Sequence, residues 1–409
     1  MRTLTGKVSR RTLIDTGLRT LAMAEAGSLL GGNAFGSDSS IERSAVCIYL
    51  SGGSDGNNMV VPMAQYSNYA AARPKLAVSE RSLLQSRPAS MMAGLGFHPA
   101  LSELKDLFEM RALSVVANVG RRRPVTLPGA AAAFEAKSLL TEEDPESNFV
   151  YPAGRIPSWT STLSGDEVQW RASAFTGFPK FGKHDTDAIP ASGMTVMSNR
   201  IHPGQGPQRA ELQKALIAEV LNGMNNVRAT FPQTGLGLEL LQVAGFLRIA
   251  HKFNITRPVF QVSQSDYSSA RDGAVDQNRL YYDLSTAMAA FYQATAETSM
   301  ASRVTTYTTS ETGRTLAENK LGGAEVGWGN NYFVMGGSVL GGDVFGQFPS
   351  YVLGGDDDAS RTGIWRPTTS ADEYSSVLAR WMGLRVRELP RTRHAISGQT
   401  VSNLNFLTS

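Results

Sequence analysis

The stretch LSGGSDGNN, residues 50–58, places an aspartate inside a glycine-rich turn directly after the apolar run 45–50. An apolar run that ends in glycines is typical of a buried strand followed by a tight turn. Two interpretations of Asp55 are open. It is a metal or phosphate ligand at the carboxyl edge of a sheet, or it is a turn residue, because Gly, Asn and Asp tolerate left-handed backbone.

Similar apolar runs recur along the chain and alternate with helical patterns. We predict strands at 44–50, 113–119, 258–263 and 303–309, and helices at 99–111, 236–252, 276–298 and 371–384. This alternation predicts an α/β fold, with a mainly parallel central sheet and helices on both faces. Ligands bind such sheets at the carboxyl ends of the strands. The turn at 52–58 and the segment 310–319 are both expected to lie there.

The composition narrows the class of protein. The 409 residues, 42% hydrophobic and 18% charged, are ordinary for a globular protein and can bury a large core. A net charge of +3 is too small for a chain of this size to indicate nucleic-acid binding. No uncharged apolar run reaches the ~18 residues that a transmembrane span requires. The one cysteine, Cys47, lies in a strand pattern and is interpreted as a core residue.

Residues 1–40 resemble a twin-arginine signal peptide. Arg10 and Arg11 precede a moderately apolar stretch at 13–30, and small residues follow at 31–40. Three charged residues interrupt the apolar stretch, so an amphipathic helix is the alternative interpretation. We expect export to the periplasm or the extracellular side. Export of an already folded chain agrees with the lack of a possible internal disulfide.

The rest of the chain is predicted to form one elaborated domain, residues 41–390, because it contains no repeat and no clear linker. An irregular segment rich in Pro, Gly, Ser and Thr, at about 141–192, is interpreted as an insertion. Residues 391–409 are expected to form a loose C-terminal tail.

Five blocks of sequence carry a family resemblance. They are LSGGSDGNN with the following Val60-Val61-Pro62, FHPAL at 97–101, SETGRT at 310–315, GWGNN at 327–331, and the closing segment 367–383. Their motif residues are Gly52, Gly53, Ser54, Gly56, Asn57, Gly313, Trp328 and Asn330. Taken together and in order, these blocks resemble the bacterial family known as domain of unknown function 1501. The resemblance extends from about residue 45 to residue 384.

The resemblance implies an alkaline phosphatase-like fold, related to the sulfatases, and twin-arginine export. In that superfamily, Asp and His ligands at strand ends hold one or two divalent cations, which activate an oxygen nucleophile. Asp55 matches the family's first acidic ligand and is the candidate metal ligand. The other candidates for a metal or anion site are Glu311, Arg314, Glu325 and Asp266. The implied cofactor is one divalent cation, Mg²⁺, Ca²⁺ or Zn²⁺.

The chain departs from the family at several ligand positions. Alanines at 130–133 stand where the family has Ser-His, and Ala324-Glu325-Val326-Gly327 stands where it has Thr-Asp-His-Gly. None of the five histidines matches a ligand position, and His98 is interpreted as structural. Two hypotheses are therefore open. The chain is a non-catalytic protein that binds an envelope protein or an extracellular polymer, or it is a metal-dependent hydrolase of phosphate or sulfate esters that uses oxygen ligands.

Overall fold

A computed structural model describes residues 41–120, 171–174, 195–198, 218–253, 257–267, 273–310, 312–383 and 404–408. The region of the twin-arginine motif lies outside these residues. So does most of the insertion predicted at 141–192, of which the described part is the strand β6 (Arg171–Ala174).

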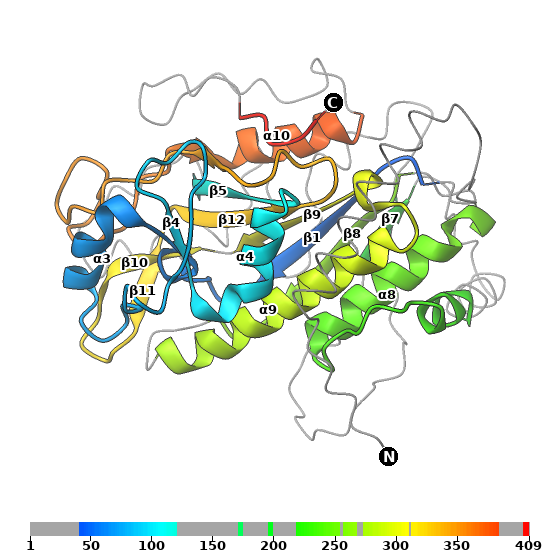
Figure 1. Ribbon diagram of the computed structural model, residues 1–409, viewed down its shortest axis with the longest axis horizontal. Coiled ribbons are helices and arrows are strands. Elements are labelled where there is room, and N and C mark those ends of the chain that lie inside the picture. The colour runs from blue at the N-terminus through cyan, green and yellow to red at the C-terminus, as the bar shows by residue number, and fades with distance from the viewer. Residues whose placement is uncertain are drawn as a thin grey trace.

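The centre of the molecule is a nine-stranded sheet (Figure 1). Its middle is formed by three parallel strands, β8 (Val259–Gln264), β1 (Ser44–Leu50) and β9 (Val304–Ser310). Beyond β9 lie β12 (Asn330–Met335), β5 (Leu113–Gly120), β13 (Val344–Gly346) and β14 (Thr369–Ser370), and beyond β8 lie β7 (Thr195–Ser198) and β6. Among the strands described, only β12 and β7 run against the others. The prediction of an α/β fold with a mostly parallel sheet is confirmed.

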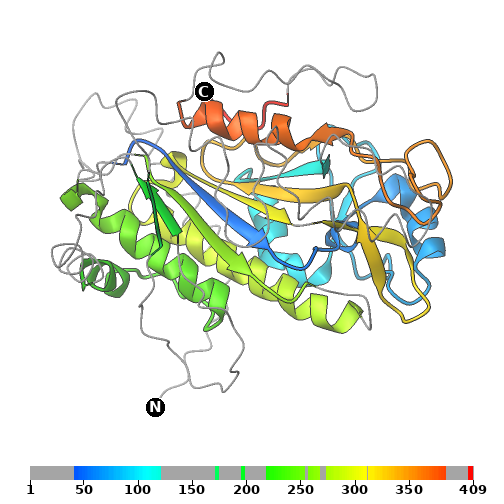
Figure 2. The same cartoon turned by 180° about the vertical axis from the view of Figure 1, so that it is seen from behind.

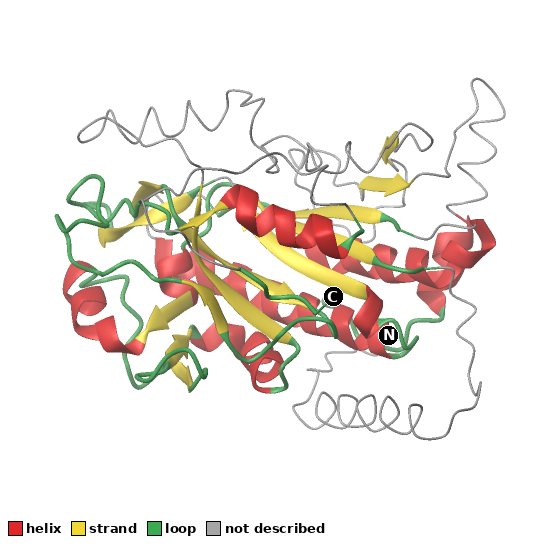
Figure 3. Ribbon diagram, turned by 90° about the horizontal axis from the view of Figure 1, so that it is seen from above, coloured by secondary structure: helices red, strands yellow, loops and turns green. Residues whose placement is uncertain are grey.

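Helices cover both faces of this sheet (Figures 1 and 2). The helices α4 (Ser102–Glu109), α8 (Gly235–Ile249) and α9 (Gly273–Ala296) lie on one face, and α10 (Ala371–Trp381) lies on the other. Seen from above, α10 crosses over the strands (Figure 3). No helix in the described part of the chain is both long enough and apolar enough to cross a membrane.

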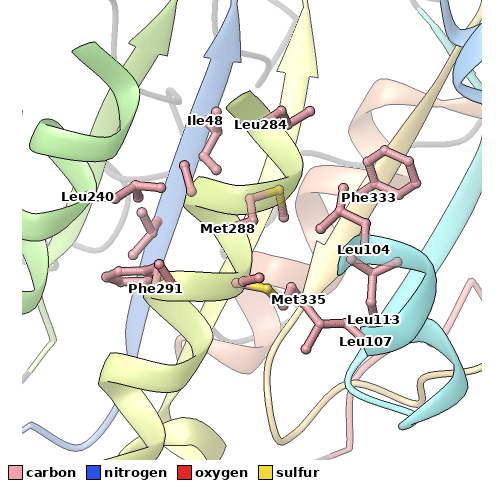
Figure 4. Close-up of a cluster of buried hydrophobic side chains, with 14 of the residues drawn as sticks. Ile48, Leu104, Leu107, Leu113, Leu240, Leu284, Met288, Phe291, Phe333 and Met335 are labelled. Atoms are coloured by element: carbon pink, nitrogen blue, oxygen red, sulfur yellow. The ribbon is translucent and has the colours of Figure 1, made fainter. Parts of the chain in front are cut away.

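The strand β1 is buried on both faces, which explains its continuous apolar sequence. Successive side chains of a strand point to opposite faces. Accordingly, Ile48 and its even-numbered neighbours join the core under α8 and α9, where they meet Leu284, Met288 and Phe291 of α9 (Figure 4). The odd-numbered side chains face the core under α10.

Cys47 is one of these odd-numbered residues and has no solvent exposure. Burial raises the pKa of its thiol to about 12, although a hydrogen bond with Tyr307 partly opposes this effect. The interpretation of Cys47 as a core residue is confirmed.

A smaller lobe, which we call the carboxyl-end lobe, extends from the carboxyl ends of β1 and β9 (Figure 1). It contains the short helices α2 (Gly56–Met59), η1 (Met63–Gln65) and α3 (Tyr66–Ala72), the three-stranded sheet β2 (Val60–Pro62), β4 (Leu95–Phe97) and β3 (Leu84–Ser86), and the hairpin β10 (Gly313–Glu318) and β11 (Ala324–Gly327). Its core is a separate apolar cluster around Tyr69, Tyr351 and Trp365. The sequence predicted none of these strands, because they are short and carry no clear alternation.

The C-terminal end of the chain differs from the loose tail that the sequence predicted. Among residues 404–408, Leu404, Phe406 and Leu407 are buried against α10 and the strands beneath it. The apolar residues of this segment are too few and too irregularly spaced to indicate packing from sequence alone. Its burial becomes visible only when the receiving surface is known.

Candidate functional site

The glycine-rich loop after β1 is shaped by contacts that leave no room for side chains. Gly52 and Gly53 have φ angles of 99° and 89°, which is left-handed backbone that favours glycine. A Cβ atom on Gly53 would lie 2.3 Å from Oγ1 of Thr312, and one on Gly56 would lie 2.1 Å from Oδ1 of Asn330. The loop therefore fits closely against the segment that follows β9 and against the start of β12.

Asp55 ends this loop and forms a buried ion pair with Arg73. The Nη1 atom of Arg73 lies 2.5 Å from Oδ2 of Asp55, and its Nη2 atom lies 3.0 Å from Oδ1. The side chain of Asp55 is 4% exposed and that of Arg73 is 0% exposed. Asp55 occupies the N-cap position of α2, but its side chain makes no capping bond. Both carboxylate oxygens thus face a guanidinium, in the bidentate geometry that Arg and Asp favour.

Arg73 uses all of its hydrogen-bond donors in this place. Besides Asp55, it donates from Nε to the carbonyl of Leu316 at 2.6 Å, from Nη2 to the carbonyl of Thr315 at 2.6 Å, and from Nη1 to Oδ1 of Asn58 at 2.7 Å. Burial opposes the charge of this guanidinium, but the adjacent Asp55 carboxylate outweighs it and raises the pKa of Arg73. The two ionised groups neutralise each other and connect α3, the glycine loop and β10.

This arrangement does not fit a divalent cation at Asp55. A cation would have to displace a buried, fully hydrogen-bonded guanidinium from both carboxylate oxygens. The displaced positive charge would then remain buried without its partner, at a cost of several kcal/mol. Asp55 is the ligand that the family resemblance implied, and here Arg73 occupies both of its carboxylate oxygens.

Arg314, the candidate side chain for anion binding, donates hydrogen bonds to backbone carbonyls of the protein. It donates from Nε to the carbonyl of Gly53 at 2.8 Å, from Nη2 to the carbonyls of Gly52 and Tyr267, the latter at 3.0 Å, and from Nη1 to the carbonyl of Ala324 at 3.4 Å. Its side chain is buried. The guanidinium gathers carbonyl oxygens from the ends of β1 and β8 and from β11, which is a structural role.

Asparagine amides complete the connections around the loop. Asn330 accepts from the amide of Gly56 at 3.1 Å and donates to Oγ of Ser54 at 3.0 Å. Asn57 donates to the carbonyl of Arg314 at 2.9 Å and accepts from the indole of Trp365 at 3.0 Å. Gly313 begins β10 beside this network, and Trp328 is half-buried in the turn before β12. The glycine loop, the segment after β9 and the start of β12 are therefore joined by hydrogen bonds at this edge of the sheet.

The remaining acidic candidates do not join Asp55. Glu325 is exposed on β11, where its carboxylate accepts from Nδ2 of Asn319 at 2.5 Å. Asp266 is exposed in left-handed backbone after β8, and its carboxylate accepts from the hydroxyl of Ser265. Glu311 lies outside the described residues. Within the described ranges, no group of three or more His, Cys, Asp or Glu side chains is arranged to hold a metal ion.

Serine hydroxyls near the loop could act as nucleophiles, but those of Ser54 and Ser310 are engaged in the same network. The hydroxyl of Ser310 donates to the carbonyl of Leu50 at 2.8 Å and accepts from the amide of Ser54 at 2.9 Å. Ser54 is completely buried, and its hydroxyl accepts from Asn330. Neither hydroxyl is presented to solvent, where a substrate would arrive. Ser268 and Ser269 lie outside the described residues.

His98 has a structural role, in agreement with its interpretation from sequence. It is the N-cap of the 3₁₀ helix η2 (Pro99–Leu101), and its Nδ1 accepts from the amide of Ala100 at 3.1 Å. Its ring meets that of Tyr281 edge-on at 5.0 Å. Burial lowers the pKa of His98 to about 4, against the opposing effects of a hydrogen bond with Asn278 and the charge of Asp55. The imidazole is therefore neutral at pH 7.

Two residues that organise this site have no signal in the sequence. Arg73 lies in an unremarkable run of alanines before a proline, and its partner is 18 positions away. Tyr281 reaches from α9 to donate to the backbone carbonyl of Asp55 at 2.9 Å, across 226 positions of sequence. Their roles depend on tertiary contacts that no local pattern records.

Comparisons of the chain with family models, with curated proteins and with solved structures found no match.

Loss of Arg73 is expected to destabilise the protein strongly. In an Arg73→Met variant the Asp55 carboxylate stays buried without a partner, so the free energy of unfolding should fall by about 3–5 kcal/mol. The double variant Asp55→Asn/Arg73→Met should lose less than the sum of the two single variants, because their interaction is counted twice in that sum. Urea unfolding monitored by circular dichroism measures these values.

The matched control is Lys105→Met, which removes the half-buried partner of the exposed Glu109, 3.3 Å away on α4. That change should cost about 0.5 kcal/mol or less. If Arg73→Met is as mild as Lys105→Met, the buried pair does not organise the loop.

The neutral state of His98 should make stability depend on pH. Its pKa falls from 6.5 to about 4 on folding, so between these pH values the unfolded chain binds a proton that the folded chain does not. The contribution of His98 to the free energy of unfolding is therefore complete above pH 6.5. It decreases by about 3 kcal/mol as the pH falls toward 4. His98→Asn keeps a capping oxygen without a titrating group. Unfolding in urea at a series of pH values should show a shallower slope for this variant, and equal slopes would contradict the assignment.

Proposed function

We propose that this chain is an exported, non-catalytic binding protein with the scaffold of the domain of unknown function 1501 family. In this proposal the scaffold is alkaline phosphatase-like and no longer carries hydrolytic chemistry. Its partner is an envelope protein or an extracellular polymer, because these are what an exported chain meets.

The ion pair between Asp55 and Arg73 is the observation that carries this proposal. Asp55 is the family ligand position that survives in the sequence, and Arg73 occupies both of its oxygens at 2.5 and 3.0 Å. A metal-dependent hydrolase requires a cation with open coordination positions for the nucleophile and the substrate. A saturated guanidinium offers none.

The surroundings of the pair support the same conclusion. Where metal-dependent hydrolases present several acidic or imidazole ligands, this loop presents neutral amides, such as Asn330, and the structural guanidinium of Arg314. Glu325 and Asp266 point to solvent at separate places. The hydrogen bonds of the loop thus maintain the fold. In the described residues, acidic side chains are not brought together as ligands for a cation.

Metal content and hydrolysis test the absence of catalysis. The purified protein should contain no stoichiometric Mg²⁺, Ca²⁺ or Zn²⁺ by elemental mass spectrometry after dialysis against each ion. It should hydrolyse p-nitrophenyl phosphate and p-nitrophenyl sulfate no faster than buffer does. About one cation per chain, lost in Asp55→Asn but retained in Glu325→Gln, would overturn the proposal and favour a hydrolase.

Export is tested separately, through the twin-arginine motif. Replacing Arg10 and Arg11 by lysine should retain the chain in the cytoplasm, because the export machinery recognises the arginine pair. Arg19→Lys, a matched change within the following stretch, should leave export intact. Fractionation of cells followed by immunoblotting distinguishes the two results. Equal distribution of both variants would exclude this route of export.

A further inference from the structure

The C-terminal segment 404–408 lies in a groove on the α10 side of the molecule. One wall is the segment Ser338, Val339 and Leu340, which connects β12 to β13. The amide of Leu340 donates to the carbonyl of Phe406 at 2.9 Å, and the amide of Thr408 donates to the carbonyl of Ser338 at 2.8 Å. Val339 and Leu407 form an antiparallel β-bridge. The segment thus runs antiparallel to this connection and pairs with it through an isolated bridge.

Side chains of the segment fill apolar positions in the groove. Phe406 is completely buried, and its ring lies 5.5 Å from that of Tyr374 on α10 and 6.1 Å from that of Phe345 on β13. Leu404 and Leu407 are also buried, whereas Asn405 and Thr408 are exposed. Proteins recognise many extended peptides by backbone hydrogen bonds together with pockets for selected side chains, and this segment is held in both ways.

The groove is anchored by bonds that do not involve the segment. The hydroxyl of Ser114 donates to the carbonyl of Leu340 at 2.8 Å, and that of Ser338 donates to the carbonyl of Ser302 at 2.6 Å. The amide of Gly342 donates to the carbonyl of Leu113 at 2.9 Å. Tyr374 is fixed by a hydrogen bond from its hydroxyl to the carbonyl of Thr308 at 3.2 Å. These hydrogen bonds hold the residues of the groove in place whether or not the segment is bound.

Chain length allows the segment to reach another molecule. Twenty residues, 384–403, separate Gly383 near the end of α10 from Leu404. A chain of this length can extend to about 65–70 Å. Exchange of an identical element between copies is a low-cost route to dimers, because each copy carries both the groove and the segment that fits it.

We propose that this groove is a peptide-binding site, and that the C-terminal segment of a second copy can replace the chain's own. The occupant is defined by its chemistry, an extended strand with apolar side chains at the positions of Leu404, Phe406 and Leu407. This inference is independent of the proposed function.

A peptide experiment on the full-length chain tests the site. The probe is a fluorescent peptide with the sequence of residues 401–409, followed by fluorescence polarisation. It should bind a Phe406→Ala chain at least ~10-fold more tightly than the unmodified chain, whose groove is filled intramolecularly. The same peptide with Ala in place of Phe406 should not bind. Failure of the unaltered peptide to bind the folded variant, or failure of the variant to fold, would show that the segment is a fixed part of the core.

Disulfide trapping tests exchange between copies without weakening the segment. Val339→Cys and Leu407→Cys chains, mixed at high concentration under mild oxidation, should form a covalent heterodimer because these positions face each other in the bridge. The control mixes Val339→Cys with Met92→Cys. Met92 is fully exposed and lies between β3 and β4 of the carboxyl-end lobe. A heterodimer that exceeds this control supports exchange. Equal yields in the two mixtures would overturn it.

Discussion

The buried pair of Asp55 and Arg73 is the interaction on which the carboxyl-end lobe depends. Two opposite charges removed from water are stable only if each is matched by the other and all remaining donors are satisfied. Here the guanidinium meets two carboxylate oxygens, one amide oxygen and two backbone carbonyls. That requirement fixes the glycine loop, α3 and β10 relative to one another, since displacement of any one would leave a buried charge or donor without its partner.

The same constraint applies to the other polar groups at the carboxyl ends of the parallel strands. Strand ends gather backbone carbonyls and loop amides at one edge, and these groups need partners whether or not a ligand is present. In this protein Arg314 and the asparagines around the loop supply them. These polar groups are thus satisfied by atoms of the protein itself.

The fold is predictable from the sequence where a single physical rule governs many residues. The continuous apolar run that became β1 and the helical spacing of Leu284, Met288 and Phe291 in α9 reflect burial, which a local pattern records. The position of the glycine loop beside the segment that begins at Ser310 also followed from strand ends meeting at one edge. The partner of Asp55 could not be predicted, because a lone Arg73 after a run of alanines has no periodic or spacing signal. The docking of residues 404–408 was missed because it depends on a groove assembled from segments far apart in the sequence.

The single thiol of the chain has a practical consequence. Cys47 lies in the central strand of the sheet, without exposure and with its pKa raised to about 12, so almost no thiolate exists near neutral pH. A disulfide reagent can react only when strand β1 separates from its neighbours, and the strands of a core separate only in the largest openings of a protein. The rate at which a reagent labels Cys47 under native conditions therefore measures how often the whole sheet opens.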